Sequence, residues 1–397
     1  MHPRLVASPT LAEVFGPGVA YVTRRSPNLV GWSPTGVGQI DFLTGLQVGL
    51  GGGIPYVACA ATVTQPGLEL CAEAGLPLDA ELHTYRSVDE YLPLLSGLIR
   101  RGYRLANQRV HPESEVPPES ACPDPGLLRR LNDKGRMTDL VSEDWLPVRR
   151  VLPALEMPDA STLLANGRPA VLKAATGSPS GGGHGVWICR STAEVETARA
   201  ALSGEERVVI EEFLDLDATL CVHGVVYPDG SSALLGAAEE ITANGRWLGN
   251  WHDAPGDDIP ESVLAVVSDI VAEAARRGYR GITGIDVARL TDGTWRVLDL
   301  NFRVNGSTAG AWLRNAIERN RGKRVIRGRT WTSAGGFEAL IRVARAAVRR
   351  GTLIPAGFYD PAACEMGGHA RMGGLLIGDS RAEIEAEIRR LLSEGLG

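Results

Sequence analysis

The segment that most limits what this chain can fold into is residues 297–307, which read VLDLNFRVNGS. Apolar and polar residues alternate as in a β-strand, and the alternation predicts that Asp299, Asn301 and Arg303 share one face. A carboxylate and an amide oxygen can hold Mg²⁺ between phosphates, and a guanidinium can neutralise a phosphoryl group in transfer. An exposed hairpin strand with a solvated polar face has the same pattern, so the interpretation depends on features upstream.

One such feature is an apolar strand at residues 169–174 that contains Lys173 near its end. A glycine-rich loop at residues 177–185 and a second strand at residues 186–189 follow it, which predicts a hairpin whose tip amides can lie over a polyphosphate. The loop is neither a P-loop nor a dinucleotide-binding turn, because no Gly-Lys-Ser/Thr and no helix follow the glycines. Many glycine-rich loops are only flexible tips, but a lysine at the base of the hairpin favours phosphate binding.

Two more features lie in order along the chain. The β-branched residues 208–210 predict a buried strand that ends at Glu211 and Glu212. A carboxylate at the end of a buried strand needs a partner, which the exocyclic amine of adenine could supply; a solvated strand end is the alternative. Lys134 is predicted on a helix of about four turns, where a lone lysine is ordinarily a surface residue.

The order of these features resembles the ATP-grasp superfamily over residues 126–310. That family typically has an E-x-N-x-R metal strand, and Asp299 stands here in place of the glutamate. The resemblance implies an α/β protein with a small lid domain and a larger antiparallel-sheet C-terminal domain, preceded by an N-terminal pre-ATP-grasp α/β domain. A looser resemblance is to ligases of natural-product pathways, namely the butirosin-type carrier-protein ligase and the pheganomycin-type peptide ligase.

The resemblance also implies ATP and Mg²⁺ as cofactors and a role for each matching residue. Residues implied in binding the nucleotide are Lys134, Lys173, Gly181, Gly182, Gly183, His184, Glu211, Glu212, Leu214 and Asp217. Residues implied in holding two Mg²⁺ are Asp286, Asp299 and Asn301, and residues implied in catalysis are Arg303, Lys173 and Asn305. Many members have a ribose-binding acid seven residues after the hinge glutamate. Ala218 occupies that position here, so Asp217 or Asp215 would have to replace it.

The implied reaction is the ADP-forming ligation of a small carboxylate to a small amine. The carboxylate attacks the γ-phosphate to give an acyl phosphate, and the amine then displaces phosphate. No protein nucleophile is needed, which agrees with the lack of a Ser-His-Asp or Cys-His signature. One alternative is thioester formation on an acyl-carrier protein, and another, from a different class, is a non-catalytic ATP-binding protein.

Composition excludes several other classes of protein. A net charge of −6 argues against a general nucleic-acid binder. The six cysteines are scattered, without metal-ligand spacing, as in a reducing cytoplasm. The longest uncharged run, residues 42–68, is broken by glycines and a proline and does not predict a membrane span, and the N-terminus has no apolar run typical of a signal peptide. We therefore expect a cytoplasmic enzyme, with homodimer formation left open.

The domain organisation follows from turn signals and from the resemblance. A proline-rich loop at residues 112–125 is the best boundary. The predicted units are an N-terminal α/β domain at 1–125, a linker helix and lid at 126–212, a catalytic domain at 213–345 and a strand-helix extension at 346–397. A basic run at residues 314–329 is either a solvated loop or a site for an anionic substrate or acidic partner.

Overall fold

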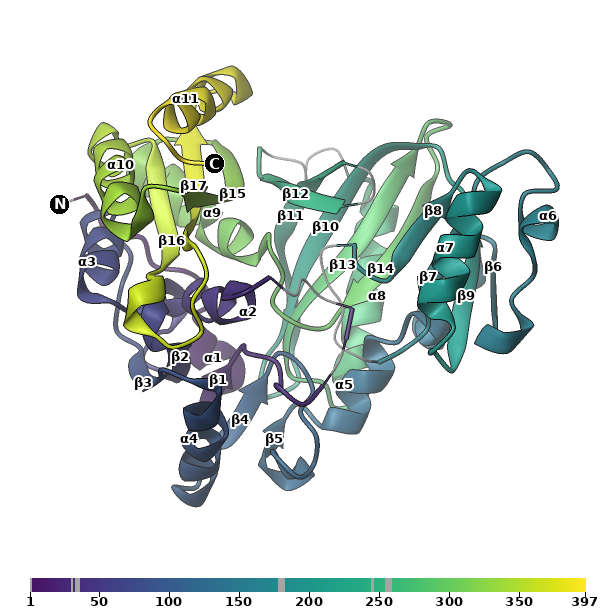
Figure 1. Ribbon diagram of the computed structural model, residues 1–397, viewed down its shortest axis with the longest axis horizontal. Helices are drawn as coiled ribbons and strands as arrows, with labels where there is room; N and C mark the ends of the chain where they lie inside the picture. Colours follow the sequence, from purple (N-terminus) through teal and green to yellow (C-terminus); the bar gives the residue numbers. More distant parts are fainter. Residues whose placement is uncertain (1, 30, 33–35, 178–182, 244–245, 254–258) are drawn as a thin grey trace.

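The computed structural model describes residues 2–29, 31–32, 36–177, 183–243, 246–253 and 259–397. Its strands form three sheets, with a parallel sheet near the N-terminus, a small antiparallel sheet and a large antiparallel sheet. In Figure 1 the small sheet lies at the right, the N-terminal sheet at the lower left, and the large sheet between and above them. This mixed α/β architecture confirms the fold class predicted from the sequence.

The N-terminal sheet has five parallel strands in the order β3-β2-β1-β4-β5. The chain builds outward from β1 to β3 and then crosses to the other side for β4, so the order reverses between β1 and β4. In open α/β sheets ligands bind at this switch point, outside the carboxyl ends of the strands.

The strands of the N-terminal sheet are β1 (Val19–Val22), β2 (Pro55–Cys59), β3 (Glu81–Tyr85), β4 (Arg104–Asn107) and β5 (Ala121–Cys122). The helices are α1 (Leu11–Phe15), α2 (Gln39–Phe42), η1 (Leu43–Gly45), η2 (Val48–Leu50), η3 (Ala60–Thr62), α3 (Gln65–Glu73), α4 (Val88–Arg100) and η4 (Pro118–Ser120).

The small sheet forms the lid, with strands in the order β6-β9-β7-β8. Strands β7 and β8 pair antiparallel, which confirms the hairpin predicted on either side of the glycine-rich loop. The strands are β6 (Arg149–Pro153), β7 (Ala170–Ala174), β8 (Val186–Cys189) and β9 (Arg207–Glu212). The helices of the linker and lid are α5 (Pro125–Leu131), η5 (Lys134–Asp139), η6 (Glu143–Trp145), η7 (Ala154–Glu156), α6 (Ala160–Leu163) and α7 (Thr192–Leu202).

The single long helix expected around Lys134 is wrong. Helix α5 ends at Leu131, and Lys134 opens the short 3₁₀ helix η5. The Oδ1 atom of Asp133 accepts a hydrogen bond from the backbone of Gly135 at 2.8 Å. Aspartate side chains compete in this way with helical hydrogen bonds, so the break falls where the sequence places Asp133.

The large sheet has eight strands in the order β14-β13-β10-β11-β12-β15-β17-β16. Its strands are β10 (Leu216–Val226), β11 (Ser232–Ala243), β12 (Arg246–Trp251), β13 (Gly281–Leu290), β14 (Trp295–Asn301), β15 (Val325–Ser333), β16 (Leu353–Tyr359) and β17 (Ala370–Gly378). Its helices are α8 (Glu261–Arg276), α9 (Thr308–Arg321), α10 (Gly336–Arg350), η9 (Pro361–Ala363) and α11 (Arg381–Ser393). Helix α10 crosses residue 345, and β16 and β17 extend the same sheet, so the C-terminal residues continue the large sheet.

The apolar cores show how these sheets are joined. One core is shared by the N-terminal sheet, helices α9 and α10, and strands β15 to β17. A second core lies between helix α8 and strands β10, β13 and β14, and the lid has a small core of its own. The N-terminal sheet is therefore packed against the C-terminal part of the chain, although the lid separates them in sequence.

The basic run at residues 314–329 does not form one exposed patch. Its side chains are divided among α9, β15 and the connection between them, and Arg327 is only 6% exposed, with its guanidinium 4.9 Å from the ring centroid of Trp251. Lys323 forms an ion pair with Asp379 at 2.6 Å. These contacts give at least part of the run a structural role.

Among the described residues, no helix has both the length and the apolar character needed to cross a membrane.

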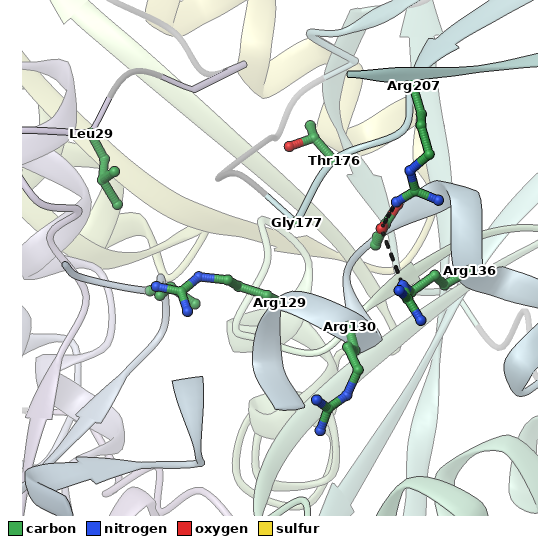
Figure 2. A pocket seen from close by; sticks show the side chains of 9 residues that line it. Leu29, Arg129, Arg130, Arg136, Thr176, Gly177 and Arg207 are labelled. Atoms are coloured by element: carbon green, nitrogen blue, oxygen red, sulfur yellow. Dashed lines mark hydrogen bonds and ion pairs between the residues drawn. The ribbon is translucent and has the colours of Figure 1, made fainter. Parts of the chain in front are cut away.

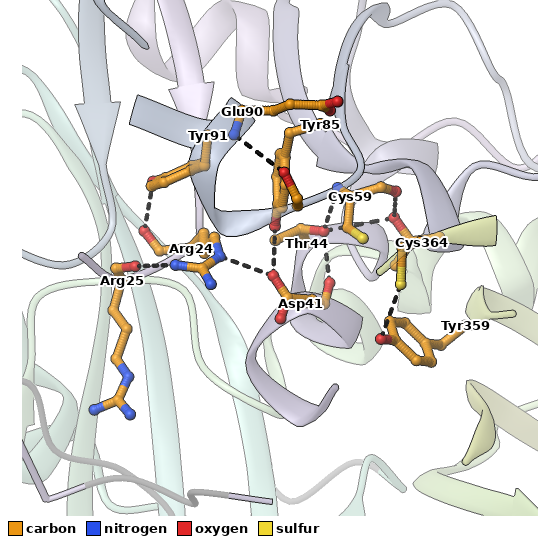
Figure 3. Close-up of polar contacts among 12 residues, drawn as sticks. Arg24, Arg25, Asp41, Thr44, Cys59, Tyr85, Glu90, Tyr91, Tyr359 and Cys364 are labelled. Carbon is orange, nitrogen blue, oxygen red and sulfur yellow. Dashed lines mark hydrogen bonds and ion pairs between the residues drawn. The ribbon is translucent and has the colours of Figure 1, made fainter. Parts of the chain in front are cut away.

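A buried ion pair stabilises the end of β1. The Nε atom of Arg24 lies 2.8 Å from Oδ1 of Asp41, and each side chain is 6% exposed. The hydroxyl of Tyr85 donates to the same oxygen at 2.9 Å, and the rings of Tyr85 and Tyr91 lie against the Arg24 guanidinium (Figure 3). The charge of Arg24 is thus compensated inside the N-terminal domain.

We predict that Asp41→Asn destabilises the protein by about 3–5 kcal/mol, because it leaves the Arg24 guanidinium buried without its counter-charge. Urea unfolding would measure the change. Asp89→Asn, at an exposed position in the first turn of α4, is the matched control and should change stability by less than about 0.5 kcal/mol. Equal stability of the two variants would contradict the importance of the pair.

Candidate active site

The three predicted metal ligands lie on two neighbouring strands of the large sheet. Asp286 of β13 pairs with Asp299 of β14, and Gly284 pairs with Asn301. The Nδ2 atom of Asn301 donates to Oδ2 of Asp286 at 2.9 Å. The structure therefore brings Asp286, Asp299 and Asn301 together at one edge of the sheet.

A bulge in β14 sets the direction of these side chains. The pairing shifts from Asp286 with Asp299 to Val287 with Val297, so Leu298 is an extra residue on β14. Val297 and Leu300 both lie in the core beneath the sheet, which simple alternation could not achieve. Bulges of this kind re-aim side chains next to active sites, and here the bulge leaves Asp299 on the face away from that core.

These residues fit a hard cation such as Mg²⁺. The Oδ1 atom of Asp286 is buried without a hydrogen-bond partner among the described residues. Two carboxylates and an amide oxygen are ligands that Mg²⁺ prefers. No three His, Cys, Asp or Glu side chains in the described part of the chain form a metal site by themselves, so phosphate or water oxygens would have to complete the shell.

The two predicted phosphate-binding lysines reach strand β14 from different elements. Lys134, in the linker, forms an ion pair with Asp299. Lys173, on lid strand β7, donates to the backbone oxygen of the bulge residue Leu298 at 3.2 Å. Lys173 also lies 2.5 Å from Oε2 of Glu211 on β9. Both lysines and Glu211 are less than a tenth exposed. Asp299 therefore compensates the buried charge of Lys134, and Glu211 compensates that of Lys173.

The electrostatics of the site favour a cation. Burial, and next to it the charge of Asp299, raises the pKa of Asp286 to about 7. Burial alone would raise the pKa of Asp299 as well, but the Lys134 ammonium lowers it below its ordinary value. Carboxylates that repel one another in this way gain from a bound positive charge.

A third carboxyl group, on Glu240, was missed by the sequence reasoning. In β11, Glu240 lies two residues from Ala238, which aligns across β10 with Asp286, so both side chains lie on the same face. Burial raises the pKa of Glu240, and Asp286 and Asp299 add to the effect. Only strand pairing brings it to the site, since two adjacent glutamates within a strand give no signal of which one faces a ligand.

Arg303 and Asn305 lie beyond the end of β14, which stops at Asn301. The NH1 atom of Arg303 donates to Oδ1 of Asn132 at 2.9 Å, and burial lowers the pKa of Arg303 while Asp299 and Asp286 act in the opposite direction. Asn305 has a local role, because its Oδ1 accepts from the backbone of Ser307 at 3.1 Å in the turn before α9. Arg303 is therefore within electrostatic reach of Asp286 and Asp299, two of the predicted metal ligands, and Asn305 stabilises the turn that follows.

The remaining candidates lie at the exit of β9 and in the glycine-rich loop. Glu212 accepts a hydrogen bond from the backbone of Val148 at 2.8 Å and is exposed. Asp217 forms an ion pair with Arg289 at 2.7 Å, and its side chain is half-exposed. Leu214 follows β9, and Gly183 and His184 precede β8, whereas Gly181 and Gly182 lie outside the described residues.

A cavity of about 280 Å³ lies beside the start of the glycine-rich loop (Figure 2). It is basic, with four arginines, and Asp133 of its wall pairs with Arg207 at 2.6 Å. None of the candidate site residues lines it. Its lining residues are Leu29, Val110, Arg129, Arg130, Asp133, Arg136, Thr176, Gly177 and Arg207.

Known proteins of similar structure share the whole architecture. N5-carboxyaminoimidazole ribonucleotide synthetase (PurK), solved with ADP, has a TM-score of 0.58 at 16% identity and covers 96% of this chain and 98% of its own. The enzyme of the same description from Thermus thermophilus has a TM-score of 0.55 at 16% identity, covering 94% and 97%. Biotin carboxylase from Campylobacter jejuni, solved as a β,γ-ATP complex, has a TM-score of 0.59 at 13% identity. The match covers 95% of this chain and 92% of that enzyme. At these identities the likeness shows the fold.

Two family models match the sequence itself. Residues 10–129 match the L-aspartate–L-methionine ligase N-terminal domain. Residues 147–301 match the L-aspartate–L-methionine ligase ATP-grasp domain. Both matches confirm the resemblance stated from the sequence, including an additional N-terminal domain. The chain therefore belongs to the ATP-grasp ligases, as an ADP-forming enzyme of ATP-dependent carboxylate–amine ligation with the N-terminal domain of the aspartate–methionine ligase group.

Proposed function

We propose that this protein joins L-aspartate to L-methionine through an amide bond, with ATP converted to ADP and phosphate. The substrates are those in the description of both family models. The observation that carries the proposal is the pairing of Asp286 with Asp299 beneath two lysines from different elements. A metal site and two cations at one strand are what phosphoryl transfer to a carboxylate requires.

Asp286, Asp299 and Asn301 would hold Mg²⁺. When bound, the metal supplies positive charge to the phosphate oxygens of ATP. Lys134 and Lys173 would then contact phosphates, exchanging their present carboxylate partners for phosphate oxygens. In this proposal the site is electrically balanced both with and without nucleotide, which limits the cost of burying its charges.

At the other end of the nucleotide, the β9 exit would bind the adenosine. Glu211 would turn from Lys173 toward the base, and the backbone at Glu212 and Leu214 would line the adenine edge. Asp217 would replace the absent ribose acid, since its carboxylate is half-exposed and pairs with a partly exposed arginine, Arg289. The glycine-rich loop, with Gly183 and His184, would cover the phosphates.

The chemistry would proceed in two balanced steps. A carboxylate oxygen of aspartate attacks the γ-phosphorus, the bond to the β-phosphate oxygen breaks, and ADP leaves with that electron pair. The methionine amine then attacks the acyl carbon, inorganic phosphate leaves, and the amine proton passes to solvent or to the phosphate. Lys173 and Arg303 would stabilise the charge that moves during these steps, and Asn305 would position the turn after Arg303.

ADP release and product mass test this function directly. We expect ADP release only with ATP, aspartate and methionine together, and a product one water lighter than the two amino acids combined. ADP release with other amino-acid pairs, and not with this pair, would overturn the substrate assignment.

Action on a carrier protein, a homodimer, a cytoplasmic location and a place in natural-product biosynthesis stay predictions from the sequence.

The first catalytic prediction concerns the metal. Asn301→Ala removes an oxygen ligand, together with the Nδ2 hydrogen bond to Asp286, and does not change the charge of the site. We expect the Mg²⁺ concentration for half-maximal rate to rise by roughly ten- to a hundred-fold, the range typical of impaired metal sites. Mg²⁺ titration of the steady-state rate measures it. Asn320→Ala, on the exposed end of α9, is the control. An unaltered Mg²⁺ dependence in Asn301→Ala would exclude the metal role.

The second concerns Arg303, which should act on rate more than on nucleotide affinity. Arg303→Lys keeps the charge but loses the planar fork of donors. We expect turnover to fall by roughly ten- to a thousand-fold with ATP affinity nearly unchanged, as when one charge-stabilising donor is lost. Calorimetric ATP binding and the ligation rate, measured on one preparation, separate the two quantities. The control is Arg296→Lys, on the same strand. If ATP binding collapses, or if the rate is unaltered, Arg303 does not have this role.

A further inference from the structure

A pair of arginines meets at the switch point of the N-terminal sheet. Strands β1 and β4 are parallel neighbours, and Val22 at the end of β1 pairs with Asn107 at the end of β4. Arg25 follows β1 by three residues, and Arg109 follows β4 by two. Both therefore leave the sheet at its carboxyl edge, where the strand order reverses and ligands bind in open α/β sheets.

This edge of the N-terminal sheet faces the active site. Gln108, between the end of β4 and Arg109, donates its backbone N–H to the oxygen of Val22 at 3.0 Å. Its side-chain Oε1 accepts from the backbone of Val304 at 2.7 Å. Since Val304 adjoins Arg303, Gln108 joins the chain just before Arg109 to the segment that follows β14.

The two arginines of the β1 end differ in their surroundings. Arg24 points into the domain and is neutralised by Asp41. Figure 3 shows Arg25 extending away from that cluster. The NH1 atom of Arg24 donates to the backbone oxygen of Arg25 at 3.0 Å, so the structural arginine helps to hold the backbone of its neighbour.

A second network fixes Arg109. The Nδ1 atom of His111 lies 3.1 Å from the backbone oxygen of Arg109, and Nε2 lies 2.9 Å from the hydroxyl of Tyr91. Burial lowers the pKa of His111 to about 4, so the ring is neutral near pH 7. Tyr91 also reaches the backbone oxygen of Arg24 at 3.1 Å, which links the two loops.

Positive charges are concentrated at this edge of the N-terminal sheet. Burial lowers the pKa of Arg109, and the nearby guanidinium groups of Arg303 and Arg25 lower it further. Burial and the charge of Arg24 lower the pKa of Arg25. Partly buried like charges repel one another, and an anion among them relieves that repulsion. Guanidinium groups bind carboxylates bidentately, which makes a carboxylate a well-matched anion.

We propose that Arg25 and Arg109 bind the second carboxylate of the dicarboxylic substrate, the one that is not activated by ATP. This inference rests on the proposed function, because aspartate is the dicarboxylic acid of that reaction. Arg303 interacts electrostatically with Arg109 and also with Asp299 and Asp286, so it can contact the carboxylate that reacts. The N-terminal domain thereby selects an acyl donor with two carboxylates. It holds one carboxylate at the switch point and directs the other toward the proposed metal site.

The test compares Arg25→Gln and Arg109→Gln with Arg100→Gln, an exposed arginine in the last turn of α4 in the same domain. For the first two, we expect the KM for aspartate to rise by about ten- to a hundred-fold, the effect of losing one charged hydrogen bond. The KM values for ATP and methionine should stay within about two-fold, because those contacts are untouched. Arg109→Lys should recover part of the loss, and Arg100→Gln should behave like the wild type.

An inhibition series gives a second readout. Succinate, which has two carboxylates, should compete with aspartate on the wild type far better than propionate, which has one. That preference should disappear in Arg25→Gln and Arg109→Gln. If the KM for methionine rises in place of that for aspartate, or if the preference for succinate survives in both variants, the proposal is overturned. Unchanged thermal unfolding of the variants separates these effects from misfolding.

The two proposals fail in distinguishable ways. If the wild type ligates aspartate to methionine and the variants match it, the arginine assignment alone is wrong. If the wild type releases no ADP with this pair, the proposed function is wrong, and the subsite is judged by calorimetric binding of succinate. Binding that is lost in both variants upholds the subsite, and absence of binding to the wild type overturns it.

Discussion

Charges taken out of water must be compensated where they lie, and this requirement governs how the lid, the linker and the large sheet meet. Lys134 and Lys173 are both less than a tenth exposed. Their counter-charges, Asp299 and Glu211, come from the large sheet and the lid respectively. Removing one member of such a pair leaves an uncompensated buried charge, which costs far more than a surface ion pair contributes. The Lys134 pair joins the linker to the large sheet, the Lys173 pair lies within the lid, and Lys173 also reaches the large sheet through the backbone oxygen of Leu298.

A backbone irregularity makes this arrangement workable. The extra residue Leu298 in β14 leaves a carbonyl oxygen that accepts from Lys173, and it turns Asp299 away from the core. The next polar contacts along the chain extend the same surface toward the N-terminal domain. Asn132 accepts from the backbone of Phe302 at 3.0 Å, and Gln108 accepts from the backbone of Val304. The segment after β14 is thus held from two sides, by the linker and by the N-terminal sheet.

Much of the fold and part of the site followed from sequence patterns. The lid hairpin and the strand around Asp299 were predicted from local alternation and turn residues, which act over a few neighbouring positions. The helix around Lys134 was wrong because one aspartate side chain interrupts it. Glu240 was missed because its place at the site depends on pairing with a strand far away in the sequence.

The sequence by itself determined the order of the functional residues and their chemical types: a lysine before the lid, a lysine within it, and acids with an asparagine on a late strand. It also determined that the chain is an ATP-grasp ligase with an additional N-terminal domain, because that order is specific even though each motif is degenerate. Only the tertiary structure decided which charges neutralise one another and which arginine of the pair after β1 is structural. Ion pairing and burial depend on distances between segments far apart in sequence, and local patterns carry no information about those distances.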